Sequence, residues 1–146
     1  MKKVCEILDE IAEESGTNNK LEILEKYKEN KELKRVIWLT YNNSIVYHIK
    51  KIPKYNNEEN SSMCLEKALD DLSVFYTREK TGNEASEYLR DMLSSLLSED
   101  AKVIENIIGR DLKIGMNAKS FNKVLGKDFI PKTPYFNSES FYLLHI

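Results

Sequence analysis

Residues 110–126, RDLKIGMNAKSFNKVLG, combine basic side chains, a glycine and a helix start in an order that suits phosphate binding. The string NAKS at 117–120 predicts the first turn of a helix, and the free N–H groups of such a turn attract anions. Gly115 precedes this turn and allows a ligand backbone to come close, because glycine has no Cβ. Arg110 and Lys113 would stand on the approach side. The alternative is a connector followed by a short core helix with a solvated lysine face.

The helix predicted after this start has an apolar side and a basic side. Phe121, Val124 and Leu125 fall together at helical spacing, whereas Lys119 and Lys123 fall opposite them. We expect the apolar side to pack in a core. The lysines then face either water or an anionic partner.

The net charge of −2 hides an uneven distribution of charged residues. A first basic block, residues 26–55, carries 8 basic and 2 acidic side chains, and a second basic block, residues 110–132, carries 6 and 2. Residues 56–109 carry 5 basic and 12 acidic side chains, and residues 1–25 carry 3 and 7. If folding brings the two basic blocks together, they form a patch that selects polyanions. The acidic stretch either meets a basic partner or is solvated.

Composition limits the class of protein further. A chain of 146 residues with 41% hydrophobic side chains suits one globular domain, and its start leads into an acidic amphipathic segment rather than a signal peptide. No apolar run is long enough to span a membrane. Two cysteines, Cys5 and Cys64, and two histidines provide neither a zinc-ligand set nor a disulfide framework. We therefore expect a cytoplasmic protein with no metal, no cofactor and no membrane partner.

Catalytic patterns are absent from the sequence. It contains no HExxH, CxxC, GxxxxGK[ST] or GxGxxG motif, and His48 and His145 lie at unrelated positions. The acidic residues Asp70 and Asp71 are adjacent, so on a helix they point in different directions and are not expected to share a metal. We expect no catalytic residue.

Hydrophobic spacing predicts helices nearly throughout and hence an all-α fold. The periodicity is clearest from Ala85 to Leu96. One continuous helix is expected over 63–78. The apolar residues of 45–52 fit both a helix and an extended segment, and of the two we favour a short helix that ends before Pro53.

A domain boundary is expected near residue 130. Residues 1–130 are predicted to form a single compact helical domain. Pro131 and Pro134 indicate an extended C-terminal tail over 131–146, whose apolar end FYLLHI could fold back on the domain.

Three separated segments resemble the N-terminal DNA-binding domain of ATP-dependent DNA ligases, and most of all that of the ligases of T-even bacteriophages. The segments are LEILEKYKENKELKRVIWLTYNNSIVYHIKKIPK at 21–54, KTGNEA at 80–85 and IIGRDLKIGMNAKSFNKVLG at 107–126, the last followed by FIP. They occur in the order expected for this domain, and the resemblance extends from Val4 to Pro134.

The resemblance implies an all-helical domain that lies across the minor groove of nicked duplex DNA and grips phosphates on both sides of the break. Such contacts position a duplex without reading its base sequence. The implied partner is double-stranded or nicked DNA in a bacterial or phage-infected cell, with a role in DNA replication and repair. Carried over by matching position, the DNA-binding residues would be Asn42, Asn43, Ser44, Lys50, Lys51, Lys54, Thr81, Gly82, Asn83, Arg110, Lys113, Gly115, Asn117, Lys119, Ser120 and Lys123.

The chain departs from the family in lacking a Lys-x-Asp-Gly motif, whose lysine takes up AMP in a ligase. The nearest string runs from Lys67 to Asp71 and does not match. The OB-fold domain that follows in ligases is not seen either. We therefore expect no ligase activity from this chain alone.

Three hypotheses about function follow from these observations. The first is a non-catalytic module that binds double-stranded DNA. The second is the DNA-binding half of a split or truncated ligase that acts with a separate nucleotidyltransferase domain, with FYLLHI as a docking element. The third is a helical protein-interaction domain that no longer binds DNA.

Overall fold

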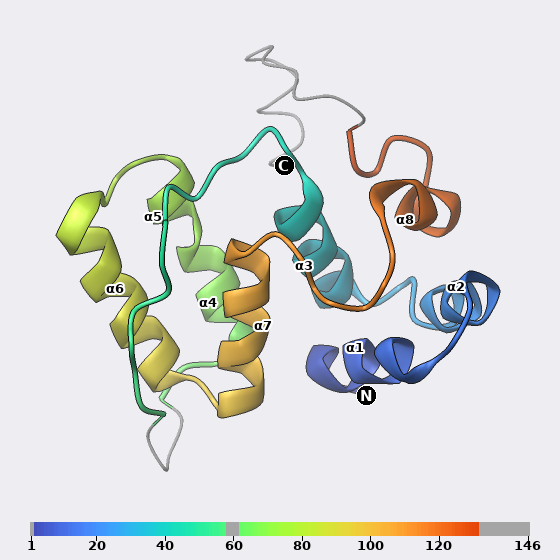
Figure 1. Ribbon diagram of the computed structural model, residues 1–146, viewed down its shortest axis with the longest axis horizontal. Helices are drawn as coiled ribbons and strands as arrows, with labels where there is room; N and C mark the ends of the chain where they lie inside the picture. The colour runs from blue at the N-terminus through green and yellow to red at the C-terminus, as the bar shows by residue number, and fades with distance from the viewer. Residues whose placement is uncertain (1, 58–61, 132–146) are drawn as a thin grey trace.

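The computed structural model describes residues 2–57 and 62–131, and within these ranges the regular structure is entirely helical (Figure 1). The all-α prediction is therefore confirmed, whereas the tail predicted over 131–146 lies, apart from Pro131, outside the described residues. None of the described helices is long and apolar enough to cross a bilayer. The helices are α1 (Val4–Glu13), α2 (Thr17–Lys26), α3 (Lys31–Tyr41), α4 (Leu65–Asp71), α5 (Ser73–Tyr76), α6 (Gly82–Ser95), α7 (Ser98–Ile108) and α8 (Ala118–Leu125).

Helix α7 lies at the centre of the fold and contacts α1, α3, α4 and α6. Figure 1 shows α4, α5 and α6 on one side of α3 and α7, and α1, α2 and α8 on the other. Helix α8 reaches the rest of the protein mainly through α2. The long connections 42–57 and 109–117 cross the face that is turned toward the viewer.

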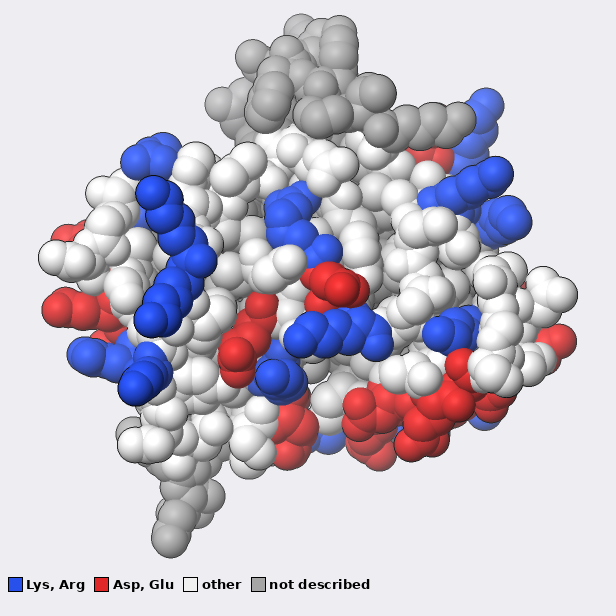
Figure 2. Space-filling model, in the orientation of Figure 1, with Lys and Arg blue, Asp and Glu red and all other residues white. Residues whose placement is uncertain are grey.

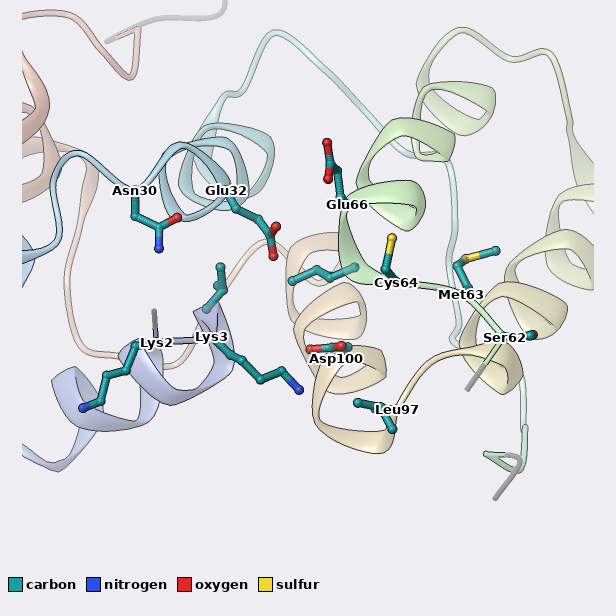
Figure 3. Close-up of a pocket in the computed structure, with 12 residues that line it drawn as sticks. Lys2, Lys3, Asn30, Glu32, Ser62, Met63, Cys64, Glu66, Leu97 and Asp100 are labelled. Atoms are coloured by element: carbon teal, nitrogen blue, oxygen red, sulfur yellow. The ribbon is translucent and has the colours of Figure 1, made fainter. Parts of the chain in front are cut away.

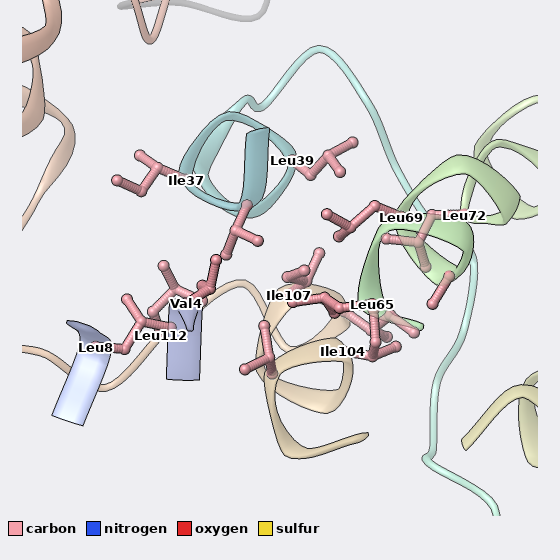
Figure 4. Close-up of a cluster of buried hydrophobic side chains, with 14 of the residues drawn as sticks. Val4, Leu8, Ile37, Leu39, Leu65, Leu69, Leu72, Ile104, Ile107 and Leu112 are labelled. Atoms are coloured by element: carbon pink, nitrogen blue, oxygen red, sulfur yellow. The ribbon is translucent and has the colours of Figure 1, made fainter. Parts of the chain in front are cut away.

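The centre of the core follows from helical spacing in α7. Ala101, Ile104 and Ile107 are fully buried and recur every third residue, so one stripe of the helix is apolar. Figure 4 shows this stripe meeting side chains from α1, α3 and α4. Each fully buried aliphatic side chain contributes about 1.5–3 kcal/mol to folding through removal of apolar surface from water.

The helix predicted over 45–52 is wrong, because this segment is an irregular extended connection. Ile45 and Tyr47 are buried, whereas Val46 is 51% exposed and His48 is exposed too. Alternate burial is the period of an extended chain, not of a helix. The buried Tyr47 hydroxyl donates to the Leu39 carbonyl oxygen at 2.6 Å, which ties the segment along α3.

The single helix predicted over 63–78 is divided into α4 and α5 at Leu72. The Ser73 hydroxyl donates to the Asp70 carbonyl oxygen at 3.3 Å, a bond that competes with the regular helical pattern. The residues predicted to face the core do so nonetheless. Those residues, all buried, are Leu65, Ala68, Leu69, Leu72 and Phe75.

We predict that Phe121→Ala lowers the free energy of unfolding by about 3–5 kcal/mol, because a large buried ring would leave a cavity. Phe121 is fully buried, and its ring centroid lies 5.0 Å from that of Tyr41. Lys123→Ala on the exposed side of the same helix is expected to change stability by less than about 0.5 kcal/mol. Urea denaturation followed by circular dichroism measures both, and equal effects would contradict the placement of α8.

Candidate functional site

The Arg110 side chain joins the two basic blocks of the sequence. Its Nη1 donates to the Ile45 carbonyl oxygen at 2.8 Å, and its Nη2 donates to the Asn42 carbonyl oxygen at 2.6 Å. Nη2 also donates to Asn43 Oδ1 at 3.2 Å. These bonds span 65 to 68 residues of sequence. The second basic block is thus held against the turn that ends α3.

The guanidinium of Arg110 is half-buried, and its hydrogen-bond acceptors are neutral oxygens. Burial lowers the pKa of Arg110, while the neighbouring Tyr47 hydroxyl acts in the opposite direction. An arginine keeps its charge in such a setting because its ordinary pKa is far above neutral pH. The turn is therefore organised around a permanent positive charge.

The connection that follows Arg110 is held in an unusual backbone conformation. Arg110 has a φ of 64°, Lys113 of 61° and Gly115 of 69°. The left-handed region is costly for residues with a Cβ, so packing and hydrogen bonds must hold the connection in place. The Leu112 amide donates to the Tyr41 hydroxyl at 3.1 Å, which fixes the middle of the connection to α3.

Gly115 lies against a lysine that sequence reasoning missed. Lys20 Nζ, on α2, donates to the Ile114 carbonyl oxygen at 2.7 Å. A Cβ at Gly115 would displace this ammonium group, which is the movable end of a long side chain, so the left-handed φ is the stronger reason for glycine here. Lys20 belongs to the acidic residues 1–25, and no local pattern in the sequence connects it with Gly115.

Helix α8 begins where the sequence predicts, and the Asn117 side chain caps it. Asn117 Oδ1 accepts a hydrogen bond from the Ser120 amide at 3.0 Å. Within the described residues the amides of Ala118 and Lys119 have no hydrogen-bond acceptor. They are thus free to bind an anion, with the exposed side chains of Lys119 and Lys123 beside them.

A groove of about 540 Å³ lies between the end of α3 and α8. Tyr41 and Asn43 line one side, and Lys119, Lys123 and Lys127 line the other. Residues from both basic blocks therefore border the same hollow. Its apolar parts come mainly from the Tyr41 ring and from residues that follow α8.

The predicted residues Lys50, Lys51 and Lys54 are exposed on the extended connection that continues from Ile45. Tyr55 anchors this connection to α7 through a hydrogen bond from its hydroxyl to the Glu105 carboxylate. Figure 2 shows basic side chains over this connection, near the 109–117 connection and by α8, all on one face. Acidic side chains gather along its lower edge by α1.

The remaining predicted residues separate into two groups. Thr81, Gly82 and Asn83 are exposed at the start of α6, on the side of α3 and α7 away from α8 (Figure 1). The structure does not bring them to the Arg110 turn. The side chains of Asn42, Ser44 and Ser120, in contrast, are buried.

Burial changes the role that these three polar residues can have. Asn42 Oδ1 accepts from the Ser44 amide at 2.9 Å, and Asn42 Nδ2 is buried without an acceptor in the described residues. A side chain that is covered by protein cannot touch a duplex unless the turn opens. Asn42, Ser44 and Ser120 therefore shape the turns that present their neighbours.

Comparison with solved structures gives the class of fold. Two chains, named Pmar-Lig_PreS3 and Pmar-Lig_Pre., each superpose with a TM-score of 0.78 at 18% sequence identity. Each match covers 85% of this chain and 29% of the other one. The all-helical fold described above is thus shared with the matched part of each of these chains.

Comparison of sequences points to DNA ligases. The chain is 36% identical over 141 residues to the DNA ligase of Enterobacteria phage T4 and, to the same extent, to that of Enterobacteria phage T6. The match covers 94% of this chain and 29% of each ligase, so the chain spans less than a third of the length of these relatives. No family model matches the chain. The resemblance to the N-terminal domain of phage DNA ligases, predicted from three segments, is confirmed.

We predict that Arg110→Lys lowers the free energy of unfolding by about 2 kcal/mol, because an ammonium group cannot replace a planar fork that binds three acceptors. Amide hydrogen exchange at Ile45 and Leu112 should rise at the same time. Lys119→Arg, an exchange between the same two residue types on the exposed side of α8, is the control. If Arg110→Lys had no more effect than the control, the guanidinium would not organise the turn.

Proposed function

We propose that this chain is a non-catalytic module that binds double-stranded DNA, nicked or intact, by gripping its phosphate backbone across the minor groove. The observation that carries the proposal is the Arg110 side chain, which joins two basic blocks that are far apart in sequence. Lysines from both blocks are exposed. A surface of this kind attracts a polyanion although the whole chain is acidic.

Some residues of this surface would contact the DNA phosphates, and others would hold the surface in shape. Lys113, Lys119 and Lys123 are exposed and can neutralise phosphates directly. The free amides at the start of α8 would add hydrogen bonds to a phosphate oxygen. Arg110, in this proposal, acts mainly by holding the surface together, because three of its five N–H donors are already used within the protein.

A duplex on this face would also reach the exposed lysines of the extended connection, Lys50, Lys51 and Lys54. The start of α6 at Thr81 to Asn83 lies further along the protein and would be a separate contact. Grips at separate points suit a module that must hold both sides of a break. Contacts of this kind carry no information about base sequence, so we expect little sequence preference.

Catalysis would need other parts of a ligase. The chain has no Lys-x-Asp-Gly motif to accept AMP, and it matches only 29% of each ligase. Within the described residues no group of histidine, cysteine and acidic side chains is placed to hold a metal ion. We therefore propose that the chain does not seal nicks by itself.

A second candidate function is that of the DNA-binding half of a ligase whose nucleotidyltransferase domain is supplied separately. The observation that favours it is the extent of the match, which covers 94% of this chain but a minor part of each ligase. The two candidates share the same DNA surface and differ in whether a catalytic partner is present.

We predict that the affinity for a nicked 20-base-pair duplex falls about a thousandfold between roughly 50 and 200 mM salt, because bound lysines release counterions from the DNA. Six exposed lysines at positions 50, 51, 54, 113, 119 and 123 are available for this exchange. Fluorescence anisotropy with nicked, intact and single-stranded DNA measures the dependence. Affinity that stays flat across this range would exclude phosphate contact and favour a protein-interaction domain.

We predict that the double variant Lys113→Glu with Lys119→Glu weakens duplex binding by at least about tenfold. The slope of the logarithm of the binding constant against the logarithm of salt concentration should become less steep by about two. The matched control is Lys31→Glu with Lys67→Glu, which changes the net charge equally. Lys31 lies at the opposite end of α3 from the Arg110 turn, and Lys67 lies on α4. Equal losses in both pairs would mean that overall charge, rather than this surface, determines binding.

We predict that adding this chain to a ligase core without its own DNA-binding domain raises the rate of nick sealing. The gain should disappear with the Lys113→Glu and Lys119→Glu variant and persist with its control. Gel analysis of a labelled nicked duplex gives the rate. Duplex binding without any stimulation of the ligase core would support the non-catalytic DNA-binding module and exclude the DNA-binding half of a ligase.

A further inference from the structure

A pocket of about 730 Å³ opens where the N-terminal ends of α1, α3, α4 and α7 meet (Figure 3). None of the residues proposed to bind DNA lines it. Its apolar walls come from Val4, Met63, Leu65 and Leu97. The pocket is therefore a feature separate from the basic surface.

Three carboxylates line this pocket, and none of them forms an ion pair there, although Lys3 is close enough to act on Asp100 and Glu32 electrostatically. Glu32, Glu66 and Asp100 form no ion pair with any described residue. The two lysines that also line it are engaged elsewhere. Lys2 pairs with Glu10, and Lys3 pairs with Glu99 at 3.2 Å; neither of these glutamates lines the pocket.

Asp100 is the least exposed of these acidic groups. Only 6% of it is exposed, and its carboxylate accepts no hydrogen bond from any residue that the structure describes. Figure 3 shows it on the wall that α7 contributes, with Glu32 and Lys3 pointing into the same space. A buried carboxylate without a donor is costly unless a ligand supplies one.

The electrostatics of the pocket agree with its geometry. Burial raises the pKa of Asp100, an effect that Lys3 partly opposes. Burial also raises the pKa of Glu32, and the nearby charges of Asp100 and Glu66 raise it further. A cation that entered the pocket would be attracted by three carboxylates and repelled by Lys3.

The rim of the pocket presents an apolar side chain to solvent. Leu97 is 39% exposed and is, with Val46, one of the two large apolar residues that are exposed in the described part of the chain. Lysine and arginine side chains have an apolar stem and a charged head, so they match a hollow with apolar walls and acidic groups inside.

We propose that this pocket is a docking site for a lysine or arginine side chain of a partner protein, with an apolar neighbour of that residue covering Leu97. The inference goes beyond DNA binding and does not depend on it. The partner is defined by its chemistry, a basic residue beside an apolar one in an exposed segment.

Cys64 gives direct experimental access to the pocket. Its thiol is exposed and lines the pocket, whereas the other cysteine, Cys5, is buried. The Cys64 thiolate can attack a disulfide reagent, which forms a mixed disulfide and releases one equivalent of thiol. Cystamine places a primary ammonium group in the pocket in this way, and hydroxyethyl disulfide places a neutral group of similar size.

We predict that the mixed disulfide with cystamine is favoured over that with hydroxyethyl disulfide by about tenfold at equilibrium. In Glu32→Gln with Asp100→Asn this preference should fall to nearly none. The control Glu87→Gln with Asp91→Asn removes two exposed carboxylates from α6 and should keep it. Intact-mass spectrometry in redox buffer measures the fraction of the chain that carries each of the two mixed disulfides at Cys64. A preference below about twofold, or one that survives in the pocket variant, would overturn the proposal.

Peptide probes distinguish a polypeptide partner from a small amine. The disulfide of Cys-Gly-Lys-Leu is compared with that of Cys-Gly-Norleucine-Leu, which has an uncharged side chain in place of lysine. We expect the lysine peptide to be favoured, and the preference to drop in Leu97→Asp. A pocket that selects cystamine but not the lysine peptide would accept small amines only, and the docking proposal would be wrong.

The pocket variant is expected to fold. Folding raises the pKa of both Glu32 and Asp100, so their contribution to stability is full below pH 4 and is lost as pH rises through the folded pKa values. Replacing them with neutral amides removes this loss at pH 7. Thermal unfolding should show the variant at least as stable as the native chain at pH 7, so a lost preference for cystamine would not result from unfolding.

Discussion

The structure of the candidate interface depends on one interaction, the clasp that Arg110 makes around the turn after α3. A half-buried guanidinium is satisfied by two carbonyl oxygens and one amide oxygen, all of them neutral. No acidic side chain is among these acceptors, so the charge is placed without being cancelled. A carboxylate partner would have given a similar geometry and removed the positive potential that a polyanion needs. The left-handed backbone at Arg110 is then the local cost of aiming this side chain back at the turn.

The core of the protein provides the rigid support for this clasp. Helix α7 is packed on several sides and delivers Arg110 at its C-terminal end. Tyr41 has two roles at the end of α3, because its hydroxyl accepts from Leu112 and its ring packs against Phe121. The clasp and α8 are therefore positioned by the same helix end. A change in the packing of α3 would move the amides and lysines of α8 together with the turn.

Features that depend on local spacing could be predicted from the sequence, whereas contacts between residues far apart in the chain could not. Regular apolar spacing identifies α6 and α7, and the asparagine at 117 identifies the start of α8. The segment 45–52 was mispredicted because β-branched and aromatic residues fit both periods, and burial against α3 decided for the extended one. The bonds of Arg110 could not be predicted in this way, because three of its five N–H donors reach acceptors 65 to 68 positions away. Lys20 and the acidic pocket were missed for the same reason, since their parts come from separate helices.

Under the proposed function, the separation of charge over the surface also determines how a duplex approaches. The net charge of −2 has little effect on DNA at a distance, because charges separated by more than about 8 Å are largely screened at physiological ionic strength. The charges on the face that is turned toward the duplex therefore decide between attraction and repulsion. Acidic side chains gather along the edge by α1, and basic ones lie across the face that carries the Arg110 turn. A chain turned the wrong way therefore meets repulsion, and one turned the right way meets attraction. In this arrangement the acidic residues contribute to orientation, which a uniformly basic surface of equal affinity would not provide.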